Sequence, residues 1–170
     1  MGISFVIHKY NDEYRDQCRA LWGELTEWHR EIYQDPTIGG EHPEDHFDEH
    51  LEEVGPDQIW VAVHESQVIG LTGLIVEGEE GEVEPIVIKK GFRKKGIGNQ
   101  LIQRIITEAR SRGIRFLKVK PVARNVLAMK FFFERGFKNL GHVEMFMDLS
   151  DSERRPWKAG PEISGCRFSF

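Results

Sequence analysis

The stretch EVEPIVIKKGFRKKGIGNQL, residues 82 to 101, decides the fold. It opens with a mostly apolar, β-branched run, 83–88, crosses a basic turn, 89–95, and reaches Gly96 and Gly98 just before a helical pattern begins. This order predicts a strand, a glycine turn and a helix N-terminus. The first N–H groups of a helix have no intrahelical partner and lie at the positive end of its dipole, so they suit a phosphate or pyrophosphate.

Two well-known phosphate loops do not fit this stretch. A Walker A loop would need Lys at 97 and Ser or Thr at 98, where the chain has Ile97 and Gly98. The dinucleotide fingerprint G-x-G-x-x-G would need a third glycine where Leu101 stands. The loop is therefore a phosphate-binding candidate of another kind.

Two motifs together resemble those of the GCN5-related N-acetyltransferase (GNAT) family. The segment from Arg93 to Gly98 is similar to R/Q-x-x-G-x-G/A, whose amides hold the pyrophosphate of acetyl-CoA in that family. A downstream block resembles N-x-x-A-x-x-[FL]-Y-x-x-x-G-F, with Asn125, Ala128, Phe131, Phe132, Gly136 and Phe137 at its positions. The resemblance is good over residues 58 to 148. It departs at Phe132, because the family's usual tyrosine there carries a hydroxyl that protonates the leaving CoA thiolate.

The resemblance implies an α/β (α+β) GNAT fold. In that fold a mixed, mostly antiparallel central sheet has flanking helices, and two parallel strands splay apart at the acetyl-CoA site. Acetyl-CoA is the implied co-substrate. The residues expected to bind it are Ile86, Val87, Ile88, Arg93, Lys94, Lys95, Gly96, Ile97, Gly98, Asn99, Asn125 and Phe132. Among them the N–H of Ile88 is expected to face the thioester carbonyl, and Asn125 either caps its helix, contacts the pantetheine or does both.

Acetyl transfer to an amine also needs a base. An amine with a pKa of about 10 is mostly protonated at neutral pH, so a carboxylate must take its proton. Glu84 is the favoured base and Glu82 is the second candidate, since both alternate onto one face of the strand where family members often carry a base. The other interpretation is that these carboxylates pair with lysines on a neighbouring strand. Cys18 and Cys166 lie outside the motifs, so direct attack in a ternary complex is expected.

The remaining pattern predicts one domain, 1–150, followed by a polar tail, 151–170. Helices are expected from residue 11 or 12 to 32, from 43 to about 54, from 99 or 100 to 113, and from 125 to 135. Strands are expected at 3–7, 58–63, 67–76, 82–88, 114–119 and 138–149, with those at 82–88 and 114–119 parallel. Trp22 and Trp28 lie on the apolar stripe of the first helix, either as core residues or as pocket walls. The tail is compatible with disorder, docking or contact with a neighbouring subunit.

Residues 41–53 are strongly acidic, and no Lys or Arg occurs between Glu31 and Asp57. Such a negative segment beside the acceptor site would attract a cationic amine, and the alternative is a solvated helix face. His42, His46 and His50 follow one another at helical spacing, which can bind a transition metal. Because Pro43 disfavours helical geometry at residue 42 and no cysteine completes the set, no metal site is assigned.

The composition excludes several classes of protein. The 170 residues carry a net charge of −5 and are 39% hydrophobic, which is ordinary for a globular domain and gives no sign of a nucleic-acid partner. No apolar run approaches the ~20 residues of a membrane span, and the N-terminus has no signal-peptide pattern. We therefore expect a cytoplasmic protein without a membrane partner. Cys18 and Cys166 are expected to be free thiols.

Three functions are compatible with these observations. The leading one is acetyl-CoA-dependent N-acetylation of a small cationic amine. The second is the same chemistry on a protein N-terminus or lysine side chain, so the acceptor partner is a small-molecule or peptide amine. The third, suggested by Phe132, is a non-catalytic acyl-CoA sensor. A homodimer is compatible with the family resemblance.

Overall fold

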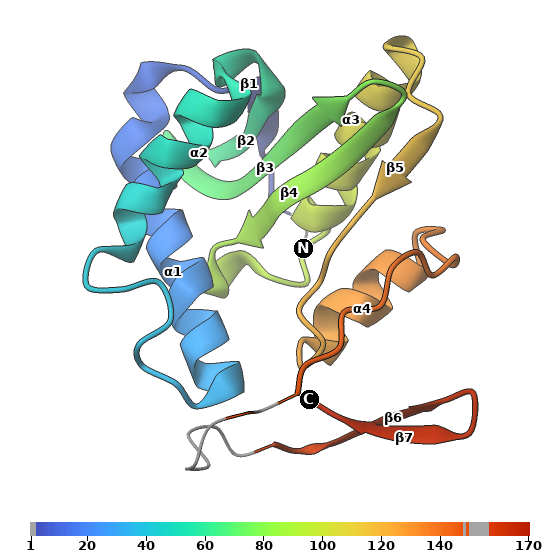
Figure 1. Ribbon diagram of the computed structural model, residues 1–170. Helices are drawn as coiled ribbons and strands as arrows, with labels where there is room; N and C mark the ends of the chain where they lie inside the picture. Colours follow the sequence, from blue (N-terminus) through green and yellow to red (C-terminus); the bar gives the residue numbers. More distant parts are fainter. Residues whose placement is uncertain (1–2, 148, 150–156) are drawn as a thin grey trace.

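The computed structural model describes residues 3–147, 149 and 157–170. Among these residues a five-stranded sheet forms the centre, in the order β1-β2-β3-β4-β5. Its strands are β1 Val6–Lys9, β2 Ile59–His64, β3 Gln67–Glu77, β4 Glu80–Ile88 and β5 Phe116–Lys118. Neighbouring strands from β1 to β4 are antiparallel, and β4 runs parallel to β5 (Figure 1). The predicted mixed, mostly antiparallel sheet is confirmed.

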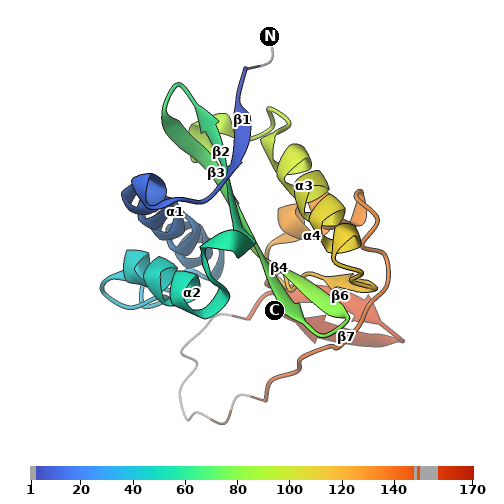
Figure 2. The same cartoon turned by 90° about the horizontal axis from the view of Figure 1, so that it is seen from above.

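Helices cover both faces of this sheet. The α-helices of the described residues are α1 Arg15–Tyr33, α2 His46–Val54, α3 Ile97–Ser111 and α4 Val126–Phe133. Short 3-10 turns are η1 Asp12–Tyr14, η2 Pro43–Asp45, η3 Pro56–Gln58 and η4 Lys90–Phe92. Figure 2 shows α1 and α2 on one side of the sheet and α3 and α4 on the other. In the described part of the chain, no helix is both long and apolar enough to span a bilayer.

Both faces of β2 are buried because the strand lies between these helical layers. Ile59 and Val61 point to the α1–α2 side, where they pack in one cluster with Phe47. Trp60 points to the other side and packs with Ile102 of α3. Neighbouring residues of a strand point to opposite faces, so β2 contributes to two apolar clusters, one on each side of the sheet.

β4 and β5 pair only at their first residues. The paired residues are Glu80 with Phe116, Gly81 with Leu117 and Glu82 with Lys118. Beyond Glu82 the two chains diverge in Figure 1, and β4 continues to Ile88 with no described strand on that side. The parallel strands are thus splayed, as expected.

One predicted strand, 138–149, is wrong over its described residues. Residues 138–147 form no ladder, and residue 148 lies outside the described residues. The side chains of Val143, Met145 and Met147 are 56%, 71% and 81% exposed. A strand needs a neighbour with free backbone groups, and β5, with three residues, offers few. Alternation in the sequence cannot show whether such an edge exists.

The end of the chain forms a hairpin, β6 Ala159–Ile163 and β7 Cys166–Ser169. Lys158 and Phe170 close it with two backbone hydrogen bonds of 3.0 and 2.9 Å. Residues 151–156 of the predicted tail lie outside the described residues. The described part of the tail is therefore ordered by backbone pairing.

Candidate active site

Along the open edge of β4, every second residue directs its backbone N–H and C=O groups away from β3. Lys89 donates its N–H to the carbonyl of Ile69 on β3 at 3.0 Å, and the β3–β4 register continues from this pair in antiparallel order. Hydrogen-bonded and non-hydrogen-bonded pairs alternate in such a ladder. The N–H and C=O groups of Ile86 and Ile88 therefore point towards the opening beside β5. Those of Val87 point to β3, so of the three expected pantetheine contacts only Ile86 and Ile88 are available.

The glycine loop ends directly at this opening. Gly96 has φ 85°, a left-handed conformation that glycine adopts without a Cβ penalty, and α3 begins at Ile97 rather than at the predicted Asn99 or the residue after it. The first intrahelical hydrogen bond runs from the N–H of Gln100 to the carbonyl of Gly96, at 3.1 Å. The N–H groups of Ile97, Gly98 and Asn99 therefore have no intrahelical acceptor. A Cβ at Gly98 would lie 3.2 Å from the ring of Phe131, so glycine lets α4 pack against this turn.

The basic residues of the loop have different surroundings. Arg93 is half-buried, donates from Nε to the Ile88 carbonyl at 3.1 Å, and holds its guanidinium 5.3 Å from the ring of Trp28. Lys94 and Lys95 are exposed beside the α3 N-terminus. The loop thus combines free amides with positive charge, which is the chemistry that a pyrophosphate needs.

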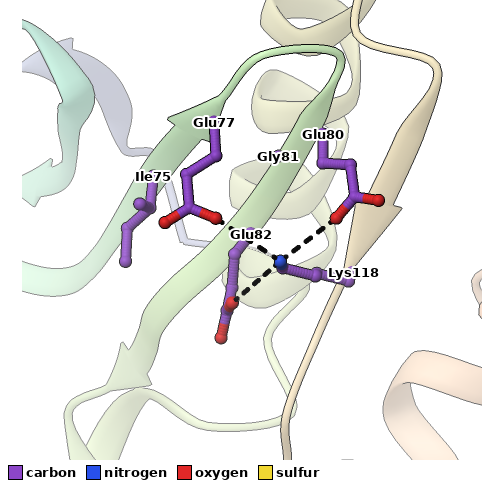
Figure 3. Close-up of a pocket in the computed structure, with 6 residues that line it drawn as sticks. All are labelled: Ile75, Glu77, Glu80, Gly81, Glu82 and Lys118. Carbon is purple, nitrogen blue, oxygen red and sulfur yellow. Dashed lines mark hydrogen bonds and ion pairs between the residues drawn. The ribbon is translucent and has the colours of Figure 1, made fainter. Parts of the chain in front are cut away.

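Glu82 lies where β4 and β5 separate. Its side chain is 6% exposed, and its carboxylate lies 2.7 Å from the ammonium of Lys120 and 3.8 Å from that of Lys118. Figure 3 shows Lys118 between Glu82, Glu77 and Glu80, at 3.8, 3.9 and 3.3 Å. The interpretation that the strand carboxylates pair with lysines is confirmed for Glu82, which makes it a poor free base.

Glu84 lies two residues further along β4 and is exposed. The protein around the exposed Glu84 still removes part of the water from its carboxyl group. This desolvation, and then the negative charge of Glu82, raise the pKa of Glu84 above its ordinary value, while Lys120 opposes the shift. The hydrogen bond to Glu82 raises the pKa of Lys120 in turn. Of the two candidate bases, Glu84 is the accessible one, and its raised pKa favours uptake of a proton.

A bulge between β3 and β4 sets the position of Glu84. The register shifts between Thr72 and Leu74, next to Gly73. A Cβ at Gly73 would lie 2.3 Å from the carbonyl oxygen of Glu84 and 3.1 Å from Nε2 of His50, so only glycine fits. His50 is 6% exposed, and its ring centroid lies 5.2 Å from that of Trp22.

In the sequence, His50 is notable only as a possible metal ligand, at helical spacing from His42 and His46. The structure buries it against the bulge, and burial lowers the pKa of its imidazole. His42 and His46 are exposed, and the described residues contain no group of three or more metal-ligating side chains. The helical position of His50, three residues after the buried Phe47, is the signal that would have placed it inward.

Helix α4 brings the second motif to the same region. Asn125 caps it, because its side-chain oxygen accepts the N–H of Ala128 at 3.1 Å. Phe132 is 6% exposed and lies edge-on to Phe131 and Phe137, with centroids 5.2 and 5.6 Å away. The capping role of Asn125 is confirmed, and Phe132 is part of an aromatic cluster.

The acidic segment is partly neutralised by α1. Arg19 pairs with both Asp45 and Asp48, and Nε of Arg15 lies 2.8 Å from Asp48. The exposed acidic residues that remain are Glu41, Glu49, Glu52 and Glu53. The segment is therefore a weaker attractor of cations than its sequence indicated.

Comparison with known proteins decides the family. Residues 22–137 match the model of the Acetyltransferase (GNAT) family. This chain belongs to the GNAT family. The GNAT fold expected from the sequence is thereby confirmed, and the splayed strands, glycine loop and α4 all lie within the matched residues. No curated protein matches the sequence.

Solved GNAT structures share the fold at low identity. A GNAT acetyltransferase from Staphylococcus aureus Mu50 aligns with TM-score 0.69 and 15% identity, over 89% of this chain and 96% of that one. The PaiA N-acetyltransferase of Thermoplasma acidophilum, in complex with coenzyme A, gives 0.67 and 15%, over 98% and 97%. The aminoglycoside enzyme AAC(6')-Iy, with a bisubstrate analogue, gives 0.63 and 18%, over 86% and 99%.

This GNAT chain also has an open pocket, called the cavity below, whose walls come from widely separated parts of the sequence. The cavity has a volume of about 340 Å³ and lies between α1, the start of α4 and the C-terminal hairpin. Its walls are Trp28, Glu31, Ile32, Arg124, Asn125, Val126, Leu127, Lys158 and Phe170. Trp28 is thus a pocket wall, whereas Trp22 packs against the core. Lys158 and Phe170 lie beyond the residues that match the family.

Proposed function

We propose that this GNAT protein transfers the acetyl group of acetyl-CoA to a primary amine, and that the acceptor is a small cationic amine. The observation that carries the proposal is the open edge of β4 next to the glycine loop. The amides of Ile97, Gly98 and Asn99 would hold the pyrophosphate, aided by the basic residues 93–95. The backbone of Ile86 and Ile88 would bind the pantetheine arm as a further strand does, with the Ile88 N–H facing the thioester oxygen.

In the proposed reaction, Glu84 takes a proton from the bound ammonium. The neutral amine attacks the thioester carbonyl carbon, and the Ile88 N–H stabilises the oxyanion. The attacking nitrogen then gives its second proton to solvent, and the C–S bond breaks to leave the neutral amide and the CoA thiolate. Phe132 has no hydroxyl to protonate this thiolate. Because a thiol has a pKa of about 8.5, the thiolate leaves without a general acid.

Direct attack is supported by the cysteines. Cys18 is buried, and burial raises the pKa of its thiol to about 12, so it is a poor nucleophile. Cys166 is free and exposed on β7, in the C-terminal hairpin beyond the family match. The amine itself is therefore the proposed nucleophile.

The donor site is tested by thermal unfolding with and without acetyl-CoA. Ligand at 100 times its Kd stabilises a protein by about 2.7 kcal/mol, which is a readily measured rise in Tm. We expect this rise in the wild type and its loss in Gly96→Asp. Gly78→Asp is the matched control, because Gly78 also has positive φ, 61°, and open space around it, but lies in the β3–β4 turn. No rise in the wild type would refute the donor site.

The transfer itself is tested by thiol release with amines. We expect Glu84→Gln to bind acetyl-CoA normally and to lose most of its turnover, by roughly 10²-fold or more. Unchanged turnover would exclude Glu84 as the base. Binding of acetyl-CoA without thiol release for any amine or peptide would favour the sensor function, which Phe132 suggests. Faster turnover of peptides than of small amines would favour a protein acceptor.

A further inference from the structure

We propose that the cavity between α1, α4 and the C-terminal hairpin is the acceptor pocket. We propose further that it selects a primary amine attached by a short chain to an aromatic group. The inference rests on the proposed N-acetyltransferase function and narrows its substrate class. It is carried by the cavity's walls, by its charge and by its connection to the open edge of β4.

The walls are mainly apolar. Trp28 and Ile32 come from α1, Val126 and Leu127 from α4, and Phe170 from the end of the hairpin. Two aromatic rings from distant parts of the chain thus face one space. The volume of about 340 Å³ lies within the range of small-molecule pockets, about 300–1,000 Å³. Such walls favour a ligand with an aromatic body.

The charged side chains of the lining are one carboxylate and two cations. Glu31 contributes one carboxylate, and exposed Lys158 contributes one ammonium. Arg124 is 8% exposed, with its guanidinium 4.8 Å from the ring of Tyr33 and a hydrogen bond to the Tyr33 carbonyl at 3.4 Å, so its charge is directed towards α1. A polyamine gains little in such a space. An amine with a single charge forms few ion pairs there, so the loss of its proton costs little binding free energy. The neutral form of the amine is the one that attacks.

The cavity adjoins the donor site through Trp28. The Trp28 ring lies 5.3 Å from the guanidinium of Arg93, whose Nε binds the Ile88 carbonyl at 3.1 Å. On the α4 side, Asn125 belongs both to the cavity wall and to the second family motif. An amine whose body fills the cavity can therefore direct its nitrogen towards the opening beside β4.

The hairpin contributes to this selection from outside the residues that match the family model. The family match ends at residue 137, whereas Lys158 and Phe170 lie beyond it. Gly160 allows the Phe170 ring to fold back, since a Cβ there would lie 2.8 Å from that ring. The hairpin thus completes the pocket with a side chain that is not among the proposed donor-binding residues.

Steady-state kinetics on the full chain test the inference. The probes are 2-phenylethylamine and 1,4-diaminobutane, each with saturating acetyl-CoA. The wild type should use 2-phenylethylamine with the higher kcat/KM. Trp28→Ala and Phe170→Ala should each raise its KM by about tenfold or more, and in Phe170→Ala the Kd for acetyl-CoA should be unchanged. Phe116→Ala is the control, because Phe116 is a 62% exposed aromatic outside the cavity, and it should leave both constants unchanged.

The outcomes separate this inference from the proposed function. If Phe170→Ala acetylates amines with an unchanged KM, the cavity is not the acceptor pocket, but the proposed N-acetyltransferase function remains. A preference for 1,4-diaminobutane, or weaker acetyl-CoA binding in Phe170→Ala, would also overturn the acceptor pocket. No thiol release with any amine would overturn both. Thermal unfolding of each variant identifies folding defects, and Phe170→Leu, which keeps an apolar side chain, should recover part of the affinity.

Discussion

Glu82 and Glu84 lie two residues apart on β4, yet their carboxylates have different surroundings. Glu82 is buried and bound by Lys118 and Lys120, whereas Glu84 is exposed and feels the charge of its neighbour. The pair thus divides two tasks, since one carboxylate holds the strands together and the other remains able to accept a proton. Lys120 links the two carboxylates, because it forms an ion pair with Glu82 and lowers the pKa of Glu84.

This arrangement predicts opposite pH shifts for two variants. Glu82→Gln removes a negative charge beside Glu84 and leaves the effect of Lys120 unopposed, so the pKa of Glu84 should fall. Since the base must be deprotonated, the acid limb of kcat/KM against pH should move to lower pH. Lys120→Gln should move it to higher pH. Initial rates of thiol release against pH give the acid limb of each variant. A shift of the two acid limbs in the same direction would contradict the assignment of Glu84 as the base.

At the scale of elements, the β3–β4 bulge connects α2 to the base. Gly73 leaves room for the Glu84 carbonyl, and His50 closes the space from α2. The backbone around Glu84 is therefore held by packing between three elements. Any atom added at Gly73 has to move one of them.

Gly73→Ala should therefore affect stability and catalysis together. With a Cβ 2.3 Å from the Glu84 carbonyl, we expect a loss of about 1–3 kcal/mol in the free energy of unfolding and a lower kcat. Gly23→Ala is the control, because Gly23 lies in α1 with nothing within 4 Å, and it should stabilise by about 0.5–1 kcal/mol. Urea unfolding and initial rates give both values. Wild-type values for Gly73→Ala would show that the bulge does not position Glu84.

These elements also show how far the sequence predicts the structure. The strand, glycine turn and helix of residues 82–101 depend on local signals, and they were predicted with an error of two or three residues at the start of α3. The bulge at Gly73 is a relation between two strands, so no single stretch contains it. The segment 138–147 has a strand pattern without a partner. The cavity combines residues from 28 to 170, and of its lining the sequence singles out only Trp28 and Asn125.

For the whole molecule, two histidines, the half-buried His29 and the buried His50, link stability to pH. Burial lowers the pKa of His29 in α1 and of His50 in α2. The unfolded chain, with histidine pKa values of about 6.5, then binds protons more readily than the folded one. The free energy of unfolding should therefore decrease as the pH falls below about 6.5 towards the lower folded pKa.

His50→Gln tests this dependence. The variant cannot charge, so its Tm should decrease less than that of the wild type between about pH 7 and pH 5. Glu84, with its raised pKa, has the opposite effect on stability, but it is present in both proteins and cancels in the comparison. His46→Gln, at an exposed position one turn earlier in α2, should follow the wild type. Parallel curves for His50→Gln and the wild type would contradict the prediction.

The splayed edge of β4 has a consequence for isotope exchange. The amide hydrogens of Ile86 and Ile88 point into the opening, whereas that of Val87 is held in the β3–β4 ladder. In the ligand-free protein, deuterium should therefore enter alternate amides of one continuous strand, quickly at 86 and 88 and slowly at 87. Acetyl-CoA bound along this edge should remove the alternation, and the same three residues would then report occupancy of the donor site without any turnover.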